Sequence, residues 1–290
     1  MSENNKKSID IKAFAKKNKI ALICVGAVAL IGILAIIINI ASTAYLKPYE
    51  KKYGITYPKG IAEEFCDAYG QNKNVSAKIT FGDAQLGEVF ILNSDYQSGD
   101  HFDEGSAIDD DAQIKSISIE SSSADIEGLY SKSKNYINST QAVYLTDIYG
   151  KSKAYQIIAA YYTNTNPSDD NGYAFPYNAC GTLTEDSFNS YEDRVMSRAL
   201  YHTGYDMSYT DRYLSISADS DFMQDFRFVI LCVEVDKIVT PYKEVTENEK
   251  VHYPQVWYDE NNEHNPYWLA GQWRPVIYTD KAHKVSRYLF

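Results

Sequence analysis

Cysteine is scarce in this sequence of 290 residues, which contains four. Cys24 lies within a long apolar run, and Cys66, Cys180 and Cys232 lie outside it. Three thiols cannot all pair within one chain, so the sequence excludes a small domain built on disulfides. A bridge between Cys66 and Cys180 stays open as an alternative, whereas Cys232 falls on the apolar face of a predicted strand and is expected to be a buried thiol.

Histidine is also scarce, and its positions do not favour a metal centre. The five histidines are too scattered for a metal-ligand pattern: His101, His202, His252, His264 and His283. The acidic run DEGSAIDDD, residues 103–111, lacks the ligand spacing of an EF-hand loop and is expected to be solvated. We therefore predict no metal and no cofactor.

Positive charge is in deficit, with 28 Lys and Arg against 39 Asp and Glu, for a net charge of −11. Six lysines precede residue 20 against Glu3 and Asp10, so the rest of the chain is more acidic than the whole. An acidic domain is a poor ligand for nucleic acid or anionic lipid. The charge therefore predicts no nucleic-acid partner and suits an extracytoplasmic surface.

One stretch carries no charge at all. Residues 20–40, IALICVGAVALIGILAIIINI, would span about 31 Å as a helix, the thickness of a bilayer core. The lysines before it indicate a cytoplasmic N-terminus, although Lys47, Lys51 and Lys52 beyond it weaken that indication. We predict a cytoplasmic tail (1–19), a transmembrane signal anchor (20–41) and an extracellular main domain on the cell membrane. A cleaved signal peptide is the alternative, but its apolar region is usually only about 7–15 residues.

The remaining sequence is rich in tyrosine and in strand patterns. A helical stalk broken at Pro48 and Pro58 is predicted over 42–73, followed by a β-rich domain over 74–236. Short helices over 121–137, with Ser123 as a cap, and an amphipathic helix over 184–201 are expected among the strands. The expected strands are 76–81, 85–92, 113–120, a hairpin over 142–163 turning near Gly150, and the pair 213–217 with 226–235.

The last strand pair contains a recognisable sequence pattern, here called the frame. Its first strand reads Leu-Ser-Ile-Ser-Ala-Asp up to Asp219, and Arg227 stands eight positions later. This frame and the order of elements from residue 41 to about 236 resemble the class B sortases, membrane-anchored cysteine transpeptidases of Gram-positive bacteria. The resemblance implies a mainly β fold, a sortase-like closed β-barrel of about eight strands with connecting helices, preceded by one N-terminal transmembrane helix.

The frame departs from the family at two of its three catalytic positions. Asp219 stands where the family has its nucleophilic cysteine, and only Arg227 matches. The family's histidine corresponds to a region around Glu120, and no histidine occurs between His101 and His202. A carboxylate is a weak nucleophile toward an amide, and a general-base role for Asp219 would need a second carboxylate such as Glu120. An ion pair between Asp219 and Arg227 is expected, and two solvated side chains are the alternative.

Residues 237–290 form an aromatic-rich C-terminal extension that class B sortases lack. It contains all three tryptophans, Trp257, Trp268 and Trp273, which are candidate binding residues for a glycan or a protein strand. The alternative is that the extension packs back on the barrel as extra strands and buries its own rings.

Together these features predict a membrane-anchored extracellular sortase-like domain that is catalytically inactive. Its expected role is peptide or protein binding, or assembly, at the bacterial cell surface. The expected partners are the membrane and a surface protein, a sorting-type peptide or a cell-wall glycan. One alternative is an active transpeptidase or hydrolase with a non-standard catalytic set, Asp219, Arg227 and Glu120. Another is an accessory subunit of a sortase or secretion complex.

Overall fold

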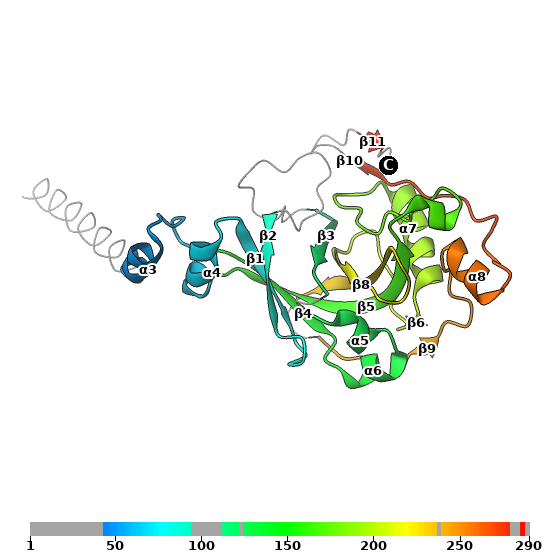
Figure 1. Ribbon diagram of the computed structural model, residues 1–290, viewed down its shortest axis with the longest axis horizontal. Coiled ribbons are helices and arrows are strands. Elements are labelled where there is room, and N and C mark those ends of the chain that lie inside the picture. Colours follow the sequence, from blue (N-terminus) through cyan, green and yellow to red (C-terminus); the bar gives the residue numbers. More distant parts are fainter. Residues whose placement is uncertain (1–42, 94–111, 122–123, 237–238, 279–284, 288–290) are drawn as a thin grey trace, which may run out of the picture. The chain divides into compact units, whose positions relative to one another are not determined.

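The computed structural model describes residues 43–93, 112–121, 124–236, 239–278 and 285–287 (Figure 1). The chain divides into two compact units, residues 1–71 and 72–290, and each is described by itself. The predicted membrane span, the acidic run 103–111 and Ser123 lie outside the described residues. None of the helices within these ranges is long and apolar enough to cross a membrane.

In its described part, residues 43–71, the first unit contains three short helices that pack around a small core. They are α3 (Leu46–Tyr53), the 3-10 helix η1 (Glu63–Phe65) and α4 (Cys66–Gln71). Pro48 does not break α3, because it lies in the first turn, where a helix needs no backbone N–H. The helix ends at Gly54, whose φ of 67° lets its N–H bond to the Glu50 carbonyl. The buried side chains of this unit are Leu46, Tyr57, Ile61, Phe65 and Cys66.

The second unit is built on one mixed sheet of seven strands, in the order β2-β1-β4-β5-β8-β7-β3. The strands are β1 (Val75–Phe81), β2 (Glu88–Leu92), β3 (Ile114–Ile119), β4 (Ala142–Asp147), β5 (Ser152–Asn164), β7 (Tyr213–Asp219) and β8 (Phe226–Val235). All neighbours are antiparallel except β3 and β7, which run parallel. The predicted hairpin over 142–163 and the predicted final strand pair are both present.

The sheet forms a nearly closed barrel of seven strands, rather than the closed barrel of about eight that the sequence predicts. Within the described ranges no pairing joins the two edge strands, β2 and β3. The short strand β6 (Tyr201–His202) does not add an eighth member, because it pairs with β9 (Thr246–Glu247) instead. Mainly β architecture with connecting helices is otherwise as predicted.

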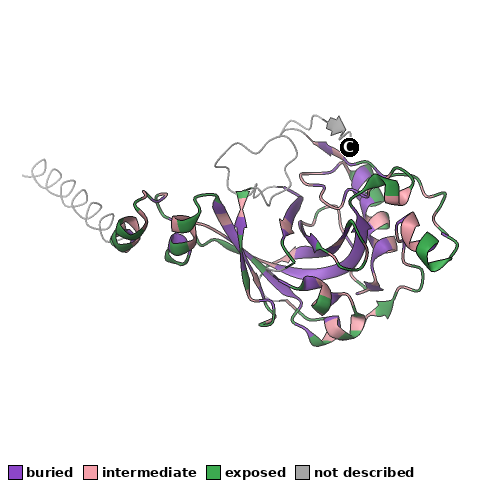
Figure 2. Cartoon of the chain, in the orientation of Figure 1, coloured by how far each residue is buried: buried purple, intermediate pink, exposed green. Residues whose placement is uncertain are grey.

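Both faces of the central strands are buried, which explains the nearly continuous apolar run in β8 (Figure 2). Side chains of α5 (Ile126–Tyr130) and α6 (Ser133–Asn138) pack into the core on one face. The helix α7 (Glu185–Arg198) packs into the core on the other face, through Phe188, Tyr191 and Val195. A bulge between Ile157 and Ala159 shifts the register of β5 where it lies between the two cores.

The C-terminal extension packs on α7 and the neighbouring loops. It contains β9, α8 (Gln255–Asn261), β10 (Val276–Tyr278) and β11 (Val285–Arg287). The Trp273 indole N–H donates to the Ser187 carbonyl at 3.1 Å, and the Val276 N–H donates to the Ser187 hydroxyl at 3.0 Å. The extension therefore belongs to the second unit.

The cysteines of the described residues are all free thiols, so Cys66 and Cys180 form no bridge. Cys232 is fully buried in β8, as its place on the apolar face predicts, and burial raises the pKa of its thiol. Cys180 is half-buried and lies next to Gly181, which bridges to Ile114 at the start of β3.

Candidate functional site

The predicted catalytic positions meet at one end of the β3–β7–β8 part of the sheet. Asp219 is the last residue of β7, and it pairs across the hairpin with Arg227, the second residue of β8. Arg227 Nη1 donates to Asp219 Oδ1 at 2.7 Å. The predicted ion pair is present, and the alternative of two solvated side chains is wrong.

Arg227 is held by more than this ion pair. Its Nη2 donates to the Ser118 hydroxyl at 2.6 Å and to the Ser217 carbonyl at 3.3 Å, and its Nε donates to the Ser217 hydroxyl at 3.3 Å. The Arg227 side chain is only 14% exposed, whereas that of Asp219 is 72% exposed. Residues of the two neighbouring strands β3 and β7 thus fix one guanidinium of β8, and all three of its nitrogens are engaged.

Sequence reasoning missed Ser118 and Ser217, although the signal was present. Ser217 stands two residues before Asp219 on β7, so the strand period places both side chains on one face. Ser118 pairs with Ser217 in the parallel ladder between β3 and β7. In the sequence alone these serines look like the polar positions of ordinary alternating strands. Their common role becomes visible only when the register between β3 and β7 is known.

Glu120 comes to the same end of the sheet. It follows β3 directly, and the last residue pair of the parallel ladder joins Ile119 to Ala218, so Glu120 and Asp219 are the next residues along each strand. Both side chains are exposed. In a carboxylate pair that acts as general acid and general base, different environments give the two carboxyl groups different roles. Here both carboxyl groups are exposed, so their environments do not distinguish them.

The loop before α7 crosses the same face of the sheet. The Tyr177 carbonyl accepts a hydrogen bond from the Ser215 hydroxyl at 3.1 Å. Burial raises the pKa of Tyr177, while Arg227 lowers it and Asp219 raises it by smaller amounts. Tyr177 therefore lies near enough to Arg227 and Asp219 for both charges to affect its pKa.

No thiol or imidazole of the described part of this unit lies at the Asp219 end. Cys232 pairs with Leu214 near the opposite end of β7, and Cys180 lies beside the first residue of β3. His202 lies in β6, and His252 and His264 lie in the C-terminal extension. Within the described ranges no group of three His, Cys, Asp or Glu side chains could hold a metal ion.

The three tryptophans have different environments. Trp273 is 5% exposed and packs between Phe175 and Tyr191 in the core beneath α7. Its burial removes Trp273 from the predicted binding set. Trp257 is half-buried on α8 and stacks on Tyr253 at 4.3 Å. Trp268 is 63% exposed, so among the three it alone presents most of its ring to solvent.

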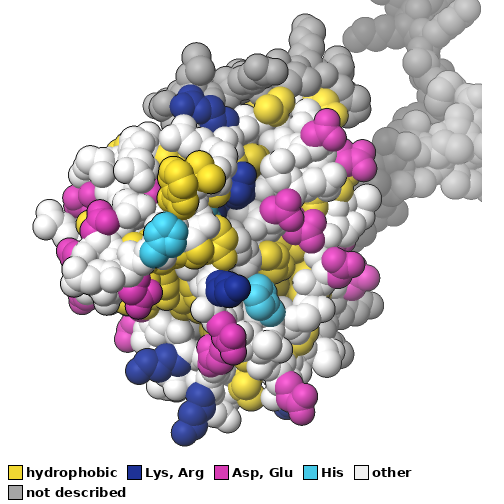
Figure 3. Space-filling view, turned by 90° about the vertical axis from the view of Figure 1, so that its right-hand side faces the viewer, with side chains coloured by type: hydrophobic (Ala, Val, Ile, Leu, Met, Phe, Trp, Pro, Cys, Tyr) yellow, Lys and Arg dark blue, Asp and Glu magenta, His cyan; other side chains and the backbone are white. Residues whose placement is uncertain are grey.

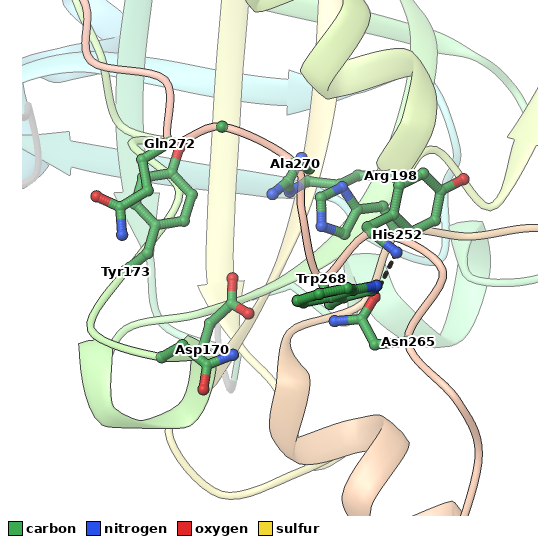
Figure 4. A pocket seen from close by; sticks show the side chains of 11 residues that line it. Asp170, Tyr173, Arg198, His252, Asn265, Trp268, Ala270 and Gln272 are labelled. Carbon is green, nitrogen blue, oxygen red and sulfur yellow. Dashed lines mark hydrogen bonds between the residues drawn. The ribbon is translucent and has the colours of Figure 1, made fainter.

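A pocket opens beside Trp268, between the extension and the end of α7 (Figure 4). The space within it, counted out to its open mouth, is about 460 Å³. Arg198, His252 and Trp268 lie together on one side, and Asp170, Tyr173 and Gln272 lie on the other (Figure 4). The remaining lining residues are Asn171, Asn265, Tyr267, Ala270 and Gly271. This pocket is distinct from the Asp219 end of the sheet, and sequence reasoning found only its rim, Trp268.

The chain was compared with known proteins by sequence and by structure. No known protein family and no curated protein matches the chain in sequence. Solved structures that match include Staphylococcus aureus sortase B, 15% identical, covering 68% of this chain and 96% of that chain with a TM-score of 0.46. Clostridium perfringens sortase B is also 15% identical and covers 60% of this chain and 100% of that chain, with a TM-score of 0.46. A Streptococcus pyogenes class B sortase involved in pilus biogenesis is 14% identical and covers 59% of this chain and 98% of that chain, with a TM-score of 0.43. All three of these solved structures are class B sortases.

Proposed function

We propose that this chain is a sortase-like surface domain without transpeptidase activity, which binds a peptide or protein, or assembles with one, at the bacterial cell surface. Residues 20–41 anchor it in the cell membrane, with the N-terminus in the cytoplasm and the main domain outside. The observation that carries this proposal is the engaged guanidinium of Arg227.

Peptide transfer by a sortase needs a thiolate nucleophile, an acid for the leaving amine and a cation for the oxyanion. Asp219 occupies the place of the thiol and binds the cation itself at 2.7 Å. An oxyanion would therefore compete with Asp219, Ser118 and Ser217 for the same guanidinium. With no imidazole nearby among the described residues, the acid is missing as well.

The ion pair has a structural explanation that needs no catalysis. A mostly buried guanidinium without a partner would be costly, and Asp219 supplies the opposite charge directly across the hairpin. The two serines accept from Nε and Nη2. Such an arrangement keeps the strand ends ordered and leaves the surface beside Tyr177 available for binding.

The test is a transpeptidation assay on the full chain in detergent micelles. The substrates are a fluorogenic sorting-type peptide and triglycine as amine acceptor, and an active class B sortase serves as the positive control. We expect no turnover above the rate without protein. Turnover that Asp219→Asn abolishes and Asp221→Asn preserves would establish the alternative enzyme with Asp219, Arg227 and Glu120. Asp221 is a matched control because it is an exposed aspartate two residues further along the same loop.

A further inference from the structure

The pocket beside Trp268 contains a buried guanidinium that has no carboxylate within ion-pair distance among the residues that the structure describes. Arg198, the last residue of α7, is 3% exposed and forms no ion pair with any residue that the structure describes. Its one hydrogen bond runs from Nη1 to the carbonyl of Arg194 in its own helix, at 3.1 Å. One face of the guanidinium lies over the Phe175 ring, with Cζ 4.5 Å from the centroid. Nε and Nη2 thus have no acceptor among the described residues, although the side chain lines a pocket.

The side chains that line the pocket carry one charge of each sign. His252 is buried against the Tyr267 ring at 4.1 Å, and its Nδ1 has no hydrogen-bond partner. Burial, together with Arg198 and Arg194, lowers the pKa of His252 to about 3, so its imidazole is neutral at pH 7. Among the lining side chains Arg198 is therefore the one cation, and the one carboxylate is that of Asp170. Its Oδ1 accepts the Gln255 N–H at 3.0 Å, which holds the carboxyl at the edge of α8.

The rim of the pocket presents an indole to solvent. Trp268 is mostly exposed, although large apolar side chains are otherwise mostly buried in this unit. On the face of the molecule that includes α8, apolar side chains lie among cationic and histidine side chains, and acidic side chains lie mostly around them (Figure 3). An indole at the mouth of a polar pocket offers a flat surface for the body of a ligand.

We propose that this pocket binds a ligand with a free carboxylate, which Arg198 Nε and Nη2 hold while the body of the ligand lies on Trp268. The planar fork of a guanidinium fits the two oxygens of a carboxylate. A phosphate fits the pocket less well, because its second charge would face Asp170. The imidazole of His252 and the amide of Gln272 also line the pocket and can bind further polar atoms of the ligand. This site is independent of the strand ends at Asp219, so it goes beyond the proposed function and does not depend on it.

A carboxylate of this kind could come from a peptide C-terminus or from a sugar acid, and the experiment separates the two. Isothermal titration calorimetry on the full chain in detergent micelles uses acetyl-Ala-Ala-Ala and its C-terminal amide in one arm. The other arm uses glucuronic acid and glucose. In at least one arm we expect the acid to bind at least about tenfold more tightly than its neutral counterpart, since hydrogen bonds to charged groups are the stronger ones. The arm that binds identifies the source.

Variants tie the binding to this pocket. Arg198→Lys keeps the charge but removes the fork, and we expect it to weaken acid binding about tenfold. Because Arg198 is buried, a substitution there also affects stability. Trp268→Ala therefore provides a second measurement at an exposed position, with an expected loss of about threefold or more. Leu269→Ala is the matched control and should change binding less than about twofold, because Leu269 is exposed next to Trp268 but does not line the pocket.

Four results would overturn the proposal. The first is equal binding of acid and neutral counterpart in both arms. The second is the absence of binding in both arms up to about 10 mM, a concentration that would detect even a very weak site. The third is tighter binding of inorganic phosphate than of either acid, and the fourth is unchanged binding by both Arg198→Lys and Trp268→Ala. None of these results bears on the transpeptidation assay, so failure of one proposal leaves the other standing.

Discussion

At the scale of single residues, Arg198 is fully buried and Arg227 is mostly buried, and the two arginines have different surroundings. Arg227 donates to one carboxylate, two hydroxyls and a carbonyl, so its charge and its donors are satisfied within the fold. Arg198 donates to one carbonyl and packs on one ring. The difference assigns a structural role to Arg227 and a binding role to Arg198.

Arg227→Gln should destabilise the second unit more than Asp219→Asn does. Loss of the guanidinium removes hydrogen bonds to Ser118 and Ser217 near the sheet, at about 1–3 kcal/mol in the free energy of unfolding. Asp219→Asn removes the charge of a carboxylate that is 72% exposed but keeps an oxygen acceptor for Arg227 Nη1, so it should cost less than about 1 kcal/mol. Urea unfolding followed by tryptophan fluorescence measures both, since all three tryptophans lie in this unit. Equal losses would mean that the ion pair, and not the serine contacts, holds the strand ends.

His252 should make the second unit less stable in mild acid. Its folded pKa of about 3 lies below the ordinary value of 6.5 because the ring is buried near Arg198 and Arg194. The unfolded chain therefore takes up a proton first, so the contribution of His252 is complete above pH 6.5 and is lost as the pH falls from 6.5 toward 3. At pH 5 the loss is about 2 kcal/mol. In His252→Gln, the fall in unfolding free energy from pH 7 to pH 5 should be smaller by that amount, and an unchanged fall would contradict the burial of a neutral imidazole.

At the scale of elements, the strands were predictable because their patterns are local. The alternation in residues 113–120 and 142–163 yields β3, β4 and β5 with only small errors at their ends. Pairing between distant strands is not local, and this is why the parallel contact of β3 with β7 was not foreseen. That contact brings Ser118 to Arg227 across 109 positions of sequence.

The C-terminal extension shows the same limit. Its aromatic residues predict either binding or burial, and composition alone cannot separate the two. Contact with α7 decides between them, since Ser187 accepts the Trp273 indole N–H while Trp268 faces solvent. The pocket itself depends on Arg198, His252 and Asp170, three residues of ordinary appearance that only the fold brings together.

The parallel register of β3 and β7 also allows a test of the sortase-like strand ends. Asp219→Cys alone should form almost no acyl-enzyme with a sorting-type peptide. An unperturbed thiol has a pKa near 8.5, so only a few per cent is thiolate at pH 7, and no acid protonates the leaving amine. Adding Glu120→His, next to position 219 in the ladder, should raise acylation about 10²-fold.

Intact-protein mass measures this acylation, and the matched control combines Asp219→Cys with Ser121→His, which moves the imidazole by one residue. Efficient acylation by Asp219→Cys alone would reveal a general acid that the structure does not place there. If neither the single nor the double variant reacts, the strand ends accommodate something other than a sorting-type peptide.

At the scale of the whole molecule, the proposed function depends on where the second unit faces. The lysines before residue 20 and the acidic charge of the rest agree with a cytoplasmic N-terminus and an extracellular main domain. Both binding surfaces, the strand ends at Asp219 and the pocket at Arg198, lie in the second unit. They would therefore meet extracellular ligands only in this orientation.

Labelling of single introduced cysteines measures which side of the membrane each part of the chain faces. Tyr149→Cys places a thiol in the exposed turn between β4 and β5, where Tyr149 is 52% exposed, and Ser2→Cys places one in the predicted cytoplasmic tail. In intact cells a membrane-impermeant maleimide should label Tyr149→Cys well above the parent protein, whose Cys66 and Cys232 are buried. Ser2→Cys should be labelled only after the membrane is permeabilised. Labelling of Ser2→Cys in intact cells, or protection of Tyr149→Cys, would mean that the orientation is the opposite one. Release of the protein into the medium with an N-terminus near residue 44 would show that residues 20–40 act as a cleaved signal peptide instead of an anchor.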